Sequence, residues 1–361
     1  MRKSLRVVHV VPAMFSPTDG IVGGAERYVH ELARHMAESA HTTLLSFGNE
    51  DRTEVCGPLR IRVLGHSHFV RGQRSNPISA GLLGELRKAD TIHCHQQHVV
   101  ASSVSAAFGR LTGKRVFVTD LGGGGWDVSA YVSTDNWYRG HLHISEYSRR
   151  IFGHAESRRA RVILGGVDTT KFSPDASVVR DGSVLFVGRL APHKGIDLLI
   201  ESMPADVRLD IIGRPFDDAY LRHLYTLSEG RFVVWHHDCD DAALVQAYRR
   251  ASCVVLPSVY ESAWSRRTEV PELLGQTLLE AMACGAPVVC TNVASMPEIV
   301  LDGHCGAIVP PNDAPALGDA VRRIARDSLL GARLGSAGRL RTLQTFTWQS
   351  VVDRCMAAYA S

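Results

Sequence analysis

Short apolar runs rich in β-branched residues alternate with helical patterns along this chain, and that alternation most restricts its possible folds. In the first half, the strand-like runs are LRVVHVVP, TTLLSF, TIHC and RVFVT. Helical spacing separates them in GAERYVHELARHMAE and VVASSVSAAFGRLTG. Strands that alternate with helices predict βαβ units, and therefore a parallel sheet with helices on both faces.

The second half repeats this alternation, with strand-like runs such as SVLFVG, VRLDIIG, CVVLP and PVVC. The segment between the halves, GGVDTTKFSPDASVVRDG, is rich in Gly, Asp, Ser and Thr, and 361 residues are enough for two domains. We therefore predict two doubly wound α/β domains that face each other across a ligand cleft. Their bounds are predicted as 1–168 and 183–342, with a linker at 169–182 and a last helix at 343–361.

Composition narrows the class of protein further. Apolar residues make up 45% of the chain and charged residues 21%, as in soluble globular proteins. No apolar run approaches the roughly 18 residues of a membrane-spanning helix. The eight cysteines are scattered and form no C-x-x-C pair. We therefore expect a reduced, cytoplasmic protein whose cysteines act as small apolar residues.

Charge is distributed unevenly along the chain. Residues 1–172 hold 22 Lys and Arg against 15 Asp and Glu, a net of +7, and the remainder holds 18 against 22, a net of −4. A basic first half is consistent with an anionic partner or surface. An ordinary solvated face explains it about as well, and this balance gives no argument for nucleic acid.

Two cations follow the run SVLFVG in SVLFVGRLAPHKGIDLL. Arg189 and Lys194 stand in the loop that would join this strand to the next helix, and Gly195 opens that helix. Cations beside the free N–H groups of a helix N-terminus form a site for phosphate. A solvated basic loop is the alternative. No G-x-x-x-x-G-K-[ST] occurs, so a Walker-type nucleotide site is not expected.

Two further segments contain residue types found in metal sites. His93 and His95 would share one face of a strand, but no acidic or cysteine cluster in the sequence completes a ligand set, so we favour a polar strand end over a metal site. The segment Asp238-Cys239-Asp240 fits the D-x-D pattern of metal-using sugar transferases. It also stands directly before the helical pattern DDAALVQAYRRA, where Asp serves as a helix N-cap, and we favour the cap.

Two glutamates bracket an apolar run in PELLGQTLLEAMACGAPVV. Eight residues of helix rise roughly 12 Å and turn about 80° from a common face, so Glu272 is predicted in the loop before the helix and Glu280 within it. Carboxylates accept hydrogen bonds from sugar hydroxyls. Two exposed helix glutamates are the alternative, but they leave the apolar flanks unexplained, because a carboxylate in such surroundings needs partners.

These segments, in this order, resemble the retaining glycosyltransferases with the GT-B fold, in the glycosyltransferase family 4 group. The two glutamates fit the E-x7-E motif of that family. The resemblance covers nearly the whole chain and includes GGAERYVHELARHM, ISEYSRR, GGVDTTKFSP, VGRLAPHKGIDLLIESM, LPSVYES, LLEAMACGAPVV and MPEIVLDGHCGAIVPPND. It implies two Rossmann-like domains and a last helix, FTWQSVVDRCMAAYAS, that crosses back onto the first domain.

The resemblance also implies roles for individual residues. Glu280 would bind the ribose of the donor nucleotide, and Glu272 would contact the transferred sugar. Arg189 and Lys194 would hold the diphosphate and stabilise it as it leaves. The remaining donor-binding positions implied by the family are Gly23, Gly24, Leu274 and Gly275, although an ordinary turn explains the first two equally well.

Two positions depart from the family pattern. The family places its first glutamate a few residues after Pro-Ser, where this chain has Glu261, and SAWSRRTEVP intervenes before Glu272. The spacing favours Glu272 as the sugar-side carboxylate, with Glu261 as the alternative. Many members carry a histidine where this chain has Asp120, which could accept a hydrogen bond from a sugar or acceptor hydroxyl, and we include it among the catalytic candidates.

Together with these residues, the resemblance implies a metal-independent enzyme that moves a sugar from a UDP- or GDP-sugar to a hydroxyl acceptor, in glycan, glycolipid or polysaccharide biosynthesis. No cofactor is expected. The expected partners are the donor and a glycan, lipid-linked or small-molecule acceptor, with peripheral contact to the inner face of a membrane through the basic first half. The alternatives are an epimerase or phosphorylase of the same fold, or a non-catalytic subunit that binds nucleotide sugars.

Overall fold

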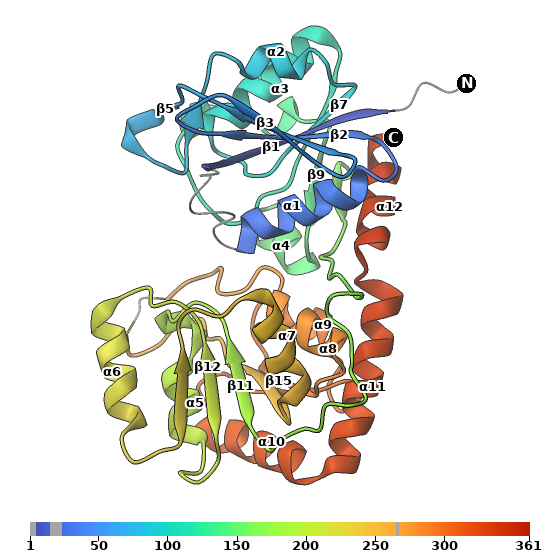
Figure 1. Cartoon of the computed structure of the whole chain (residues 1–361). Coiled ribbons are helices and arrows are strands. Elements are labelled where there is room, and N and C mark those ends of the chain that lie inside the picture. The colour runs from blue at the N-terminus through green and yellow to red at the C-terminus, as the bar shows by residue number, and fades with distance from the viewer. Residues whose placement is uncertain (1–4, 15–23, 265–266) are drawn as a thin grey trace. The chain divides into compact units, whose positions relative to one another are not determined.

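The computed structural model describes residues 5–14, 24–264 and 267–361 (Figure 1). The chain divides into two compact units. The first contains residues up to Gly166 together with Trp348–Ser361, and the second is Val167–Thr347. Each unit is an α/β layer structure in which helices pack on a central, mainly parallel sheet, as the alternation of strand and helix patterns predicts.

The unit boundaries differ from the predicted ones. The segment 169–182, predicted as a linker, lies in the second unit. Arg180 holds it there, because its guanidinium donates to the backbone oxygens of Arg249 and Gly285 at 3.2 and 2.6 Å. The predicted boundary at 342/343 falls inside helix α11 (Ser328–Thr345), and the last helix, α12 (Trp348–Tyr359), begins five residues later than predicted and belongs to the first unit.

The sheet of the first unit has the strand order β10-β9-β8-β7-β1-β2-β4-β3. All neighbours are parallel except β3, which pairs antiparallel with β4 at one edge. The four runs predicted as strands are β1 (Arg6–Met14), β2 (His41–Phe47), β7 (Thr91–Cys94) and β8 (Arg115–Val118). The others are β3 (Arg52–Cys56), β4 (Leu59–Leu64), β9 (Gly140–His143) and β10 (Ala160–Val162).

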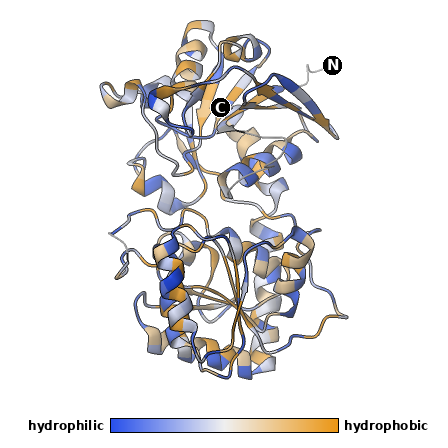
Figure 2. Ribbon diagram, turned by 60° about the vertical axis from the view of Figure 1, so that its left-hand side comes forward, coloured by the Kyte–Doolittle hydropathy of each residue, from blue (hydrophilic) through white to orange (hydrophobic). Residues whose placement is uncertain are grey.

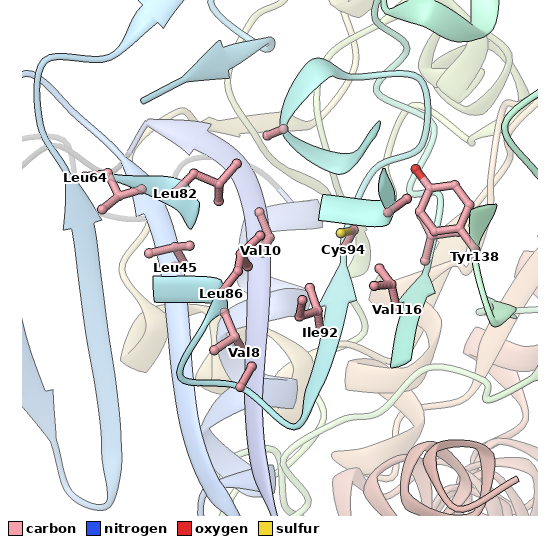
Figure 3. Close-up of a cluster of buried hydrophobic side chains, with 14 of the residues drawn as sticks. Val8, Val10, Leu45, Leu64, Leu82, Leu86, Ile92, Cys94, Val116 and Tyr138 are labelled. Carbon is pink, nitrogen blue, oxygen red and sulfur yellow. The ribbon is translucent and has the colours of Figure 1, made fainter. Parts of the chain in front are cut away.

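The two faces of this sheet differ in chemistry. Val8 and Val10 of β1 point into an apolar cluster with Ile92 and Cys94 of β7 and side chains from the neighbouring strands (Figure 3). His9 lies between the two valines, so the period-2 alternation of a strand turns it to the opposite face. The helices of this unit are α1 (Gly24–Met36), α2 (Leu82–Leu86), α3 (Val100–Thr112), α4 (Glu146–Ile151) and α12.

Short elements complete the first unit. A small antiparallel ribbon joins two strands, and turns of 3-10 helix lie in the loops. They are β5 (His68–Phe69), β6 (Pro77–Ile78), η1 (Val70–Gly72), η2 (Val128–Ala130) and η3 (Asp135–Trp137).

The second unit has a fully parallel sheet with the order β13-β12-β11-β14-β15-β16. Its strands are hydrophobic, while the helices around them alternate hydrophobic and hydrophilic positions (Figure 2). The strands are β11 (Val184–Val187), β12 (Leu209–Ile212), β13 (Val233–His236), β14 (Cys253–Leu256), β15 (Val288–Thr291) and β16 (Ala307–Val309). The strand order changes direction between β11 and β14, and open parallel sheets bind ligands outside the carboxyl ends of strands at such a switch point.

The helices of the second unit cover both faces of this sheet. They are α5 (Ile196–Ser202), α6 (Asp218–Ser228), α7 (Asp241–Arg250), α8 (Gln276–Ala283), α9 (Met296–Ile299), α10 (Ala314–Arg326) and α11. A 3-10 turn, η4 (Pro192–Lys194), stands in the loop between β11 and α5.

Candidate functional site

The loop that follows β11 carries the two predicted cations and packs closely against the end of β14. Gly195, directly after Lys194, has a φ of 64°, in the left-handed region. A Cβ atom at Gly195 would lie 2.2 Å from the carbonyl oxygen of Pro257. Only glycine meets both conditions without strain. The close packing places Lys194 beside the loop after β14, at the switch point of the sheet.

Lys194 forms an ion pair with Glu272, which the spacing argument placed just before a helix. The side chains of Lys194 and Glu272 are 13% and 10% exposed. The same carboxylate oxygen, Oε1 of Glu272, accepts a hydrogen bond from Oγ of the buried Ser258 at 2.9 Å. Neither bond uses Oε2. Glu272 is therefore held through one oxygen by two donors from two other loops.

Arg189, the other predicted cation, is exposed, and its guanidinium carbon lies 5.7 Å from the centre of the Phe216 ring. His193, in η4, was not predicted as a site residue. Burial, assisted by the charge of Lys194, lowers the pKa of His193 to about 4, while Glu272 acts in the opposite direction and Arg189 adds to the lowering. The structure therefore gathers Arg189, Lys194 and Glu272 around a neutral histidine. The sequence signal for it was only its place between two cations.

Glu280 lies within α8, as predicted, and is 6% exposed. Its Oε2 accepts a hydrogen bond from the hydroxyl of Tyr248, in α7, at 2.9 Å. Burial and the neighbouring carboxylate raise the pKa of Tyr248 well above its usual value, so the phenol keeps its proton and donates it. Gln276, one turn earlier in α8, donates to Oε1 at 3.4 Å. Tyr248 was not predicted, because it comes from an element 32 residues away.

The start of α8 lies close to the end of β11. Gly275 stands at the N-cap position with a φ of 70°, and no side chain caps this helix end. The hydroxyl of Thr277, in the first turn, donates to the backbone oxygen of Val187 at 3.0 Å. The uncapped N–H groups of α8 therefore lie next to the loop that carries Arg189. Leu274, predicted to bind the donor, is buried with 8% of its surface exposed.

Two sequence alternatives can be compared with the structure. Glu261, the other candidate for the sugar-side carboxylate, is exposed, and the charge it faces is that of Arg267. Residues 265–266 of the inserted segment lie outside the described residues. Asp240 is the N-cap of α7, where its Oδ1 accepts from the N–H of Ala243 at 2.8 Å. The preference for a helix cap at this D-x-D is therefore confirmed for Asp240, and Asp238 forms an exposed ion pair with Arg214 at 3.4 Å.

The other predicted site residues belong to the first unit. Asp120 follows β8 and is 6% exposed, and its Oδ1 accepts from the N–H of Gly122 at 2.8 Å. Burial raises the pKa of Asp120, although the hydrogen bond from Gly122 acts in the opposite direction. Gly24 is the exposed first residue of α1, and Gly23 lies outside the described residues.

His93 and His95 face the α12 side of the first sheet together with His9. Ring nitrogens of the three histidines lie within 4.8 Å of one another. Both nitrogens of His93 are already engaged by hydroxyl groups, that of Tyr359 at 2.7 Å and that of Thr119 at 2.8 Å. Burial lowers the pKa of all three, so they are neutral. The group is a hydrogen-bonded polar layer in the core, and the absence of a metal from the site stays a prediction.

Two further observations concern the cysteines and the lengths of the helices. All eight cysteines are free, and six of them are buried. In the part of the chain that the structure describes, no helix combines the length and the apolar surface needed to cross a bilayer.

Two family models match the chain in succession. Residues 22–171 match "Glycosyltransferase Family 4" and residues 169–341 match "Glycosyl transferases group 1". Among curated proteins, the α-maltose-1-phosphate synthase of Mycobacterium tuberculosis is 29% identical over 66% of this chain and 67% of its own. The D-inositol 3-phosphate glycosyltransferase of Geodermatophilus obscurus is 32% identical over 60% of this chain. The phosphatidyl-myo-inositol mannosyltransferase of Mycobacterium leprae is 31% identical over 61%. The last two alignments span 51% and 58% of the relatives' own lengths.

Solved structures share the fold over nearly the whole chain. The sucrose-phosphate synthase of Thermosynechococcus elongatus superposes with a TM-score of 0.72 at 19% identity, covering 99% of this chain and 98% of that one. Anabaena HepE, in complex with UDP and glucose, gives a TM-score of 0.72 at 18% identity and covers 99% of both chains. The fold predicted from the sequence, two Rossmann-like domains of the GT-B type, is therefore confirmed.

Proposed function

Because the chain belongs to the glycosyltransferases of group 1 and family 4, we propose that it transfers a sugar from a nucleoside-diphosphate sugar to a hydroxyl group, with retention of configuration at the anomeric carbon. The observation that carries this proposal is the arrangement around Glu272. A carboxylate held by Lys194 and Ser258 stands at the switch point of a parallel sheet, next to a second cation, Arg189. A site of this kind can bind a diphosphate and a sugar side by side.

The proposed chemistry depends on the leaving group. Breaking the glycosidic bond of the donor builds negative charge on the diphosphate and positive charge on the anomeric carbon. Arg189 and Lys194 face the first of these charges, assisted by the uncapped N–H groups at the start of α8. Groups placed where charge develops are each worth about a hundredfold or more in rate. Because two cations already serve the diphosphate, we propose that the reaction needs no metal ion and no cofactor.

The two glutamates take different parts in this scheme. Glu280, oriented by Tyr248, would bind the donor ribose, and Glu272 would accept from a hydroxyl of the transferred sugar. Retention requires the acceptor to attack from the face that the diphosphate leaves, and a phosphate oxygen is then the nearest base. The same scheme assigns Asp120 to the acceptor side. It assigns four further residues to donor binding: Gly23, Gly24, Leu274 and Gly275.

The donor and acceptor are proposed by class. Solved neighbours contain UDP, as in Anabaena HepE, or ADP, as in the starch synthase IV of Arabidopsis thaliana. We propose a UDP- or GDP-sugar as donor, and a glycan, a lipid-linked sugar or a small molecule as acceptor, in polysaccharide or glycolipid biosynthesis. A cytoplasmic protein with peripheral contact to a membrane would suit a lipid-linked acceptor.

The test is donor turnover across a panel of UDP-, GDP- and ADP-sugars, with the anomeric configuration of the product read by NMR. We expect release of nucleoside diphosphate from at least one donor, a product with the donor's configuration, and undiminished activity in EDTA. Loss of activity in EDTA that Mg²⁺ or Mn²⁺ restores would contradict the metal-independent scheme. Donor binding without turnover would instead identify a binding subunit, and turnover to an isomer without acceptor an epimerase.

A further inference from the structure

A cavity in the first unit is lined by basic side chains, and none of the predicted site residues is part of its lining. Its volume is about 530 Å³, within the range of small-molecule sites. Arg110 contributes from the last turn of α3, Lys114 from the turn that follows it, and Arg115 from the first position of β8. Val116 and Phe117 of β8 are among its apolar lining residues. We call this cavity the basic groove.

A second set of cations enters the basic groove from the neighbouring strands. Arg139 stands directly before β9, Arg158 and Arg159 precede β10, and Arg161 lies within it. Because β8, β9 and β10 are adjacent and parallel, their amino ends meet at one edge of the sheet. The segments RLTGKR, YRG and SRRAR each place cations at the start of a strand, and the fold brings them together.

No acidic side chain lines the basic groove, and among the described residues none of its seven cations forms an ion pair with an Asp or Glu side chain. Ser361 also lines the groove, and its main-chain oxygen accepts from Arg139 at 3.2 Å. Several of the other cations donate to neutral acceptors that hold them in place. Arg110 binds the backbone oxygen of Asn136 at 2.9 Å, Arg159 binds the side-chain oxygen of Asn136 at 3.0 Å, and Lys114 binds the backbone oxygen of Arg87 at 3.0 Å.

The basic groove is separate from the residues assigned to the acceptor side. Asp120 follows the carboxyl end of β8, whereas Arg115 is its first residue. Five residues of extended chain span roughly 17 Å, so the two lie at opposite edges of the same sheet. Ligands of doubly wound sheets bind at the carboxyl edge, so a ligand in the basic groove would not displace a substrate there.

We propose that the basic groove binds a compound with two or more phosphate groups. Guanidinium groups match phosphate oxygens in pairs, and several oriented guanidiniums with no acidic side chain among them select a polyanion over a single carboxylate. The half-buried Trp137, which is part of the lining, offers an apolar contact for the organic part of the ligand. This site does not depend on the proposed transferase activity.

The test uses inorganic tripolyphosphate as the soluble probe, and binding is measured by calorimetry and by the change in intrinsic tryptophan fluorescence, to which Trp137 contributes. The double variant Arg139→Gln/Arg161→Gln removes two exposed cations, so folding should be unaffected. One basic residue near a phosphate surface strengthens binding by about fivefold. Because the double variant removes two such residues, we expect its affinity for tripolyphosphate to be at least about tenfold lower. The matched control, Arg74→Gln/Arg150→Gln, removes two exposed arginines outside the groove and should bind like the wild type.

Two further experiments identify where tripolyphosphate binds and which kind of phosphate compound the groove takes. Lys194→Gln removes a cation of the donor loop in the second unit and should leave this binding in place, which separates the groove from donor phosphate binding. Vesicles of phosphatidylcholine with and without phosphatidylinositol 4-phosphate identify the source of the phosphates: groove-dependent binding to the phosphorylated vesicles assigns a lipid headgroup, and binding of tripolyphosphate alone assigns a free phosphorylated compound. Equal binding by wild type and Arg139→Gln/Arg161→Gln, or no binding of tripolyphosphate at millimolar concentration, would overturn the proposal.

Discussion

The ion pair between Lys194 and Glu272 allows the sharpest test of the site, because its energy can be measured separately from its function. Both side chains are close to nine-tenths buried, with 13% and 10% exposed. Removal of one partner from a buried pair leaves the other charge uncompensated and costs up to about 3–5 kcal/mol. Glutamine at position 272 keeps an oxygen for Ser258, so we expect about 1–3 kcal/mol for Glu272→Gln.

A double-mutant cycle isolates the pair. The variants Lys194→Gln, Glu272→Gln and the double variant are unfolded in urea, and the coupling free energy is expected to be about 1–3 kcal/mol. The control is the exposed pair Asp319–Arg322 of α10, whose side chains are 75% and 36% exposed. Exposed pairs of this spacing couple by about 0.3–0.5 kcal/mol. A coupling for Lys194 and Glu272 as small as that of the control would refute the description of a buried, mutually dependent pair.

Kinetics of the same variants tests the proposed roles. Glu272→Gln should lower turnover about a hundredfold yet leave the affinity for the nucleoside diphosphate nearly unchanged, because the partner of Glu272 is the reacting sugar. Lys194→Gln should lower both. Glu261→Gln, a change to an exposed carboxylate, should do little of either. If Glu261→Gln gave the turnover defect while Glu272→Gln behaved like the wild type, the sugar-side carboxylate would be Glu261.

Three further outcomes follow from the contacts of single residues. Glu280→Gln should weaken the binding of both donor and nucleoside diphosphate by about 1.5–3 kcal/mol, measured by calorimetry, since it removes the charge from the proposed hydrogen bond to the ribose. Gly195→Ala should destabilise the second unit in urea by at least about 1 kcal/mol, because alanine resists the positive φ and its Cβ would meet a carbonyl oxygen at 2.2 Å. Burial lowers the pKa of His9 and His143 to about 3, so between pH 6.5 and pH 3 the unfolded chain binds protons at these two histidines and the folded chain does not. The free energy of unfolding should therefore be highest above pH 6.5 and should fall by up to about 1.4 kcal/mol per pH unit for each histidine as the pH drops toward 3. A melting temperature that stays constant from pH 7 to pH 4 would contradict this last expectation.

The strands that the sequence predicted well are those with continuous apolar runs, and the ones it missed are informative. The runs that became β11 and β14 consist of apolar residues alone and are buried at nearly every position, so their composition identifies them as strands. β9 has the sequence GHLH, and two buried histidines disguise it as a polar segment. Its place in the sheet comes from parallel pairing with β8 and β10, a long-range contact that no local pattern records.

In the candidate site, too, local sequence predicted some features, and others depend on contacts between distant segments. Periodicity alone placed Glu272 before α8 and Glu280 inside it, because the rotation of a helix over eight residues is fixed by geometry. Their partners could not be found in this way. Ser258 and Tyr248 are ordinary residues at the end of β14 and within α7, and they reach the carboxylates only because the parallel sheet gathers the ends of β11 and β14. Sequence patterns identified the charged groups, and tertiary structure selected the neutral groups that orient them.

The difference between these partners explains why one helix turn and the loop before it carry two carboxylates. Glu272 is paired with Lys194, which in the proposed scheme would also bind the donor diphosphate, so arrival of the donor would divide Lys194 between two anions and make the position of Glu272 sensitive to the phosphate group. Glu280 is bound to a phenol that keeps its proton, so its orientation is independent of the ligand charge. A rigid acceptor suits the ribose, which does not react. An acceptor coupled to the diphosphate suits the transferred sugar, whose bond to that diphosphate breaks.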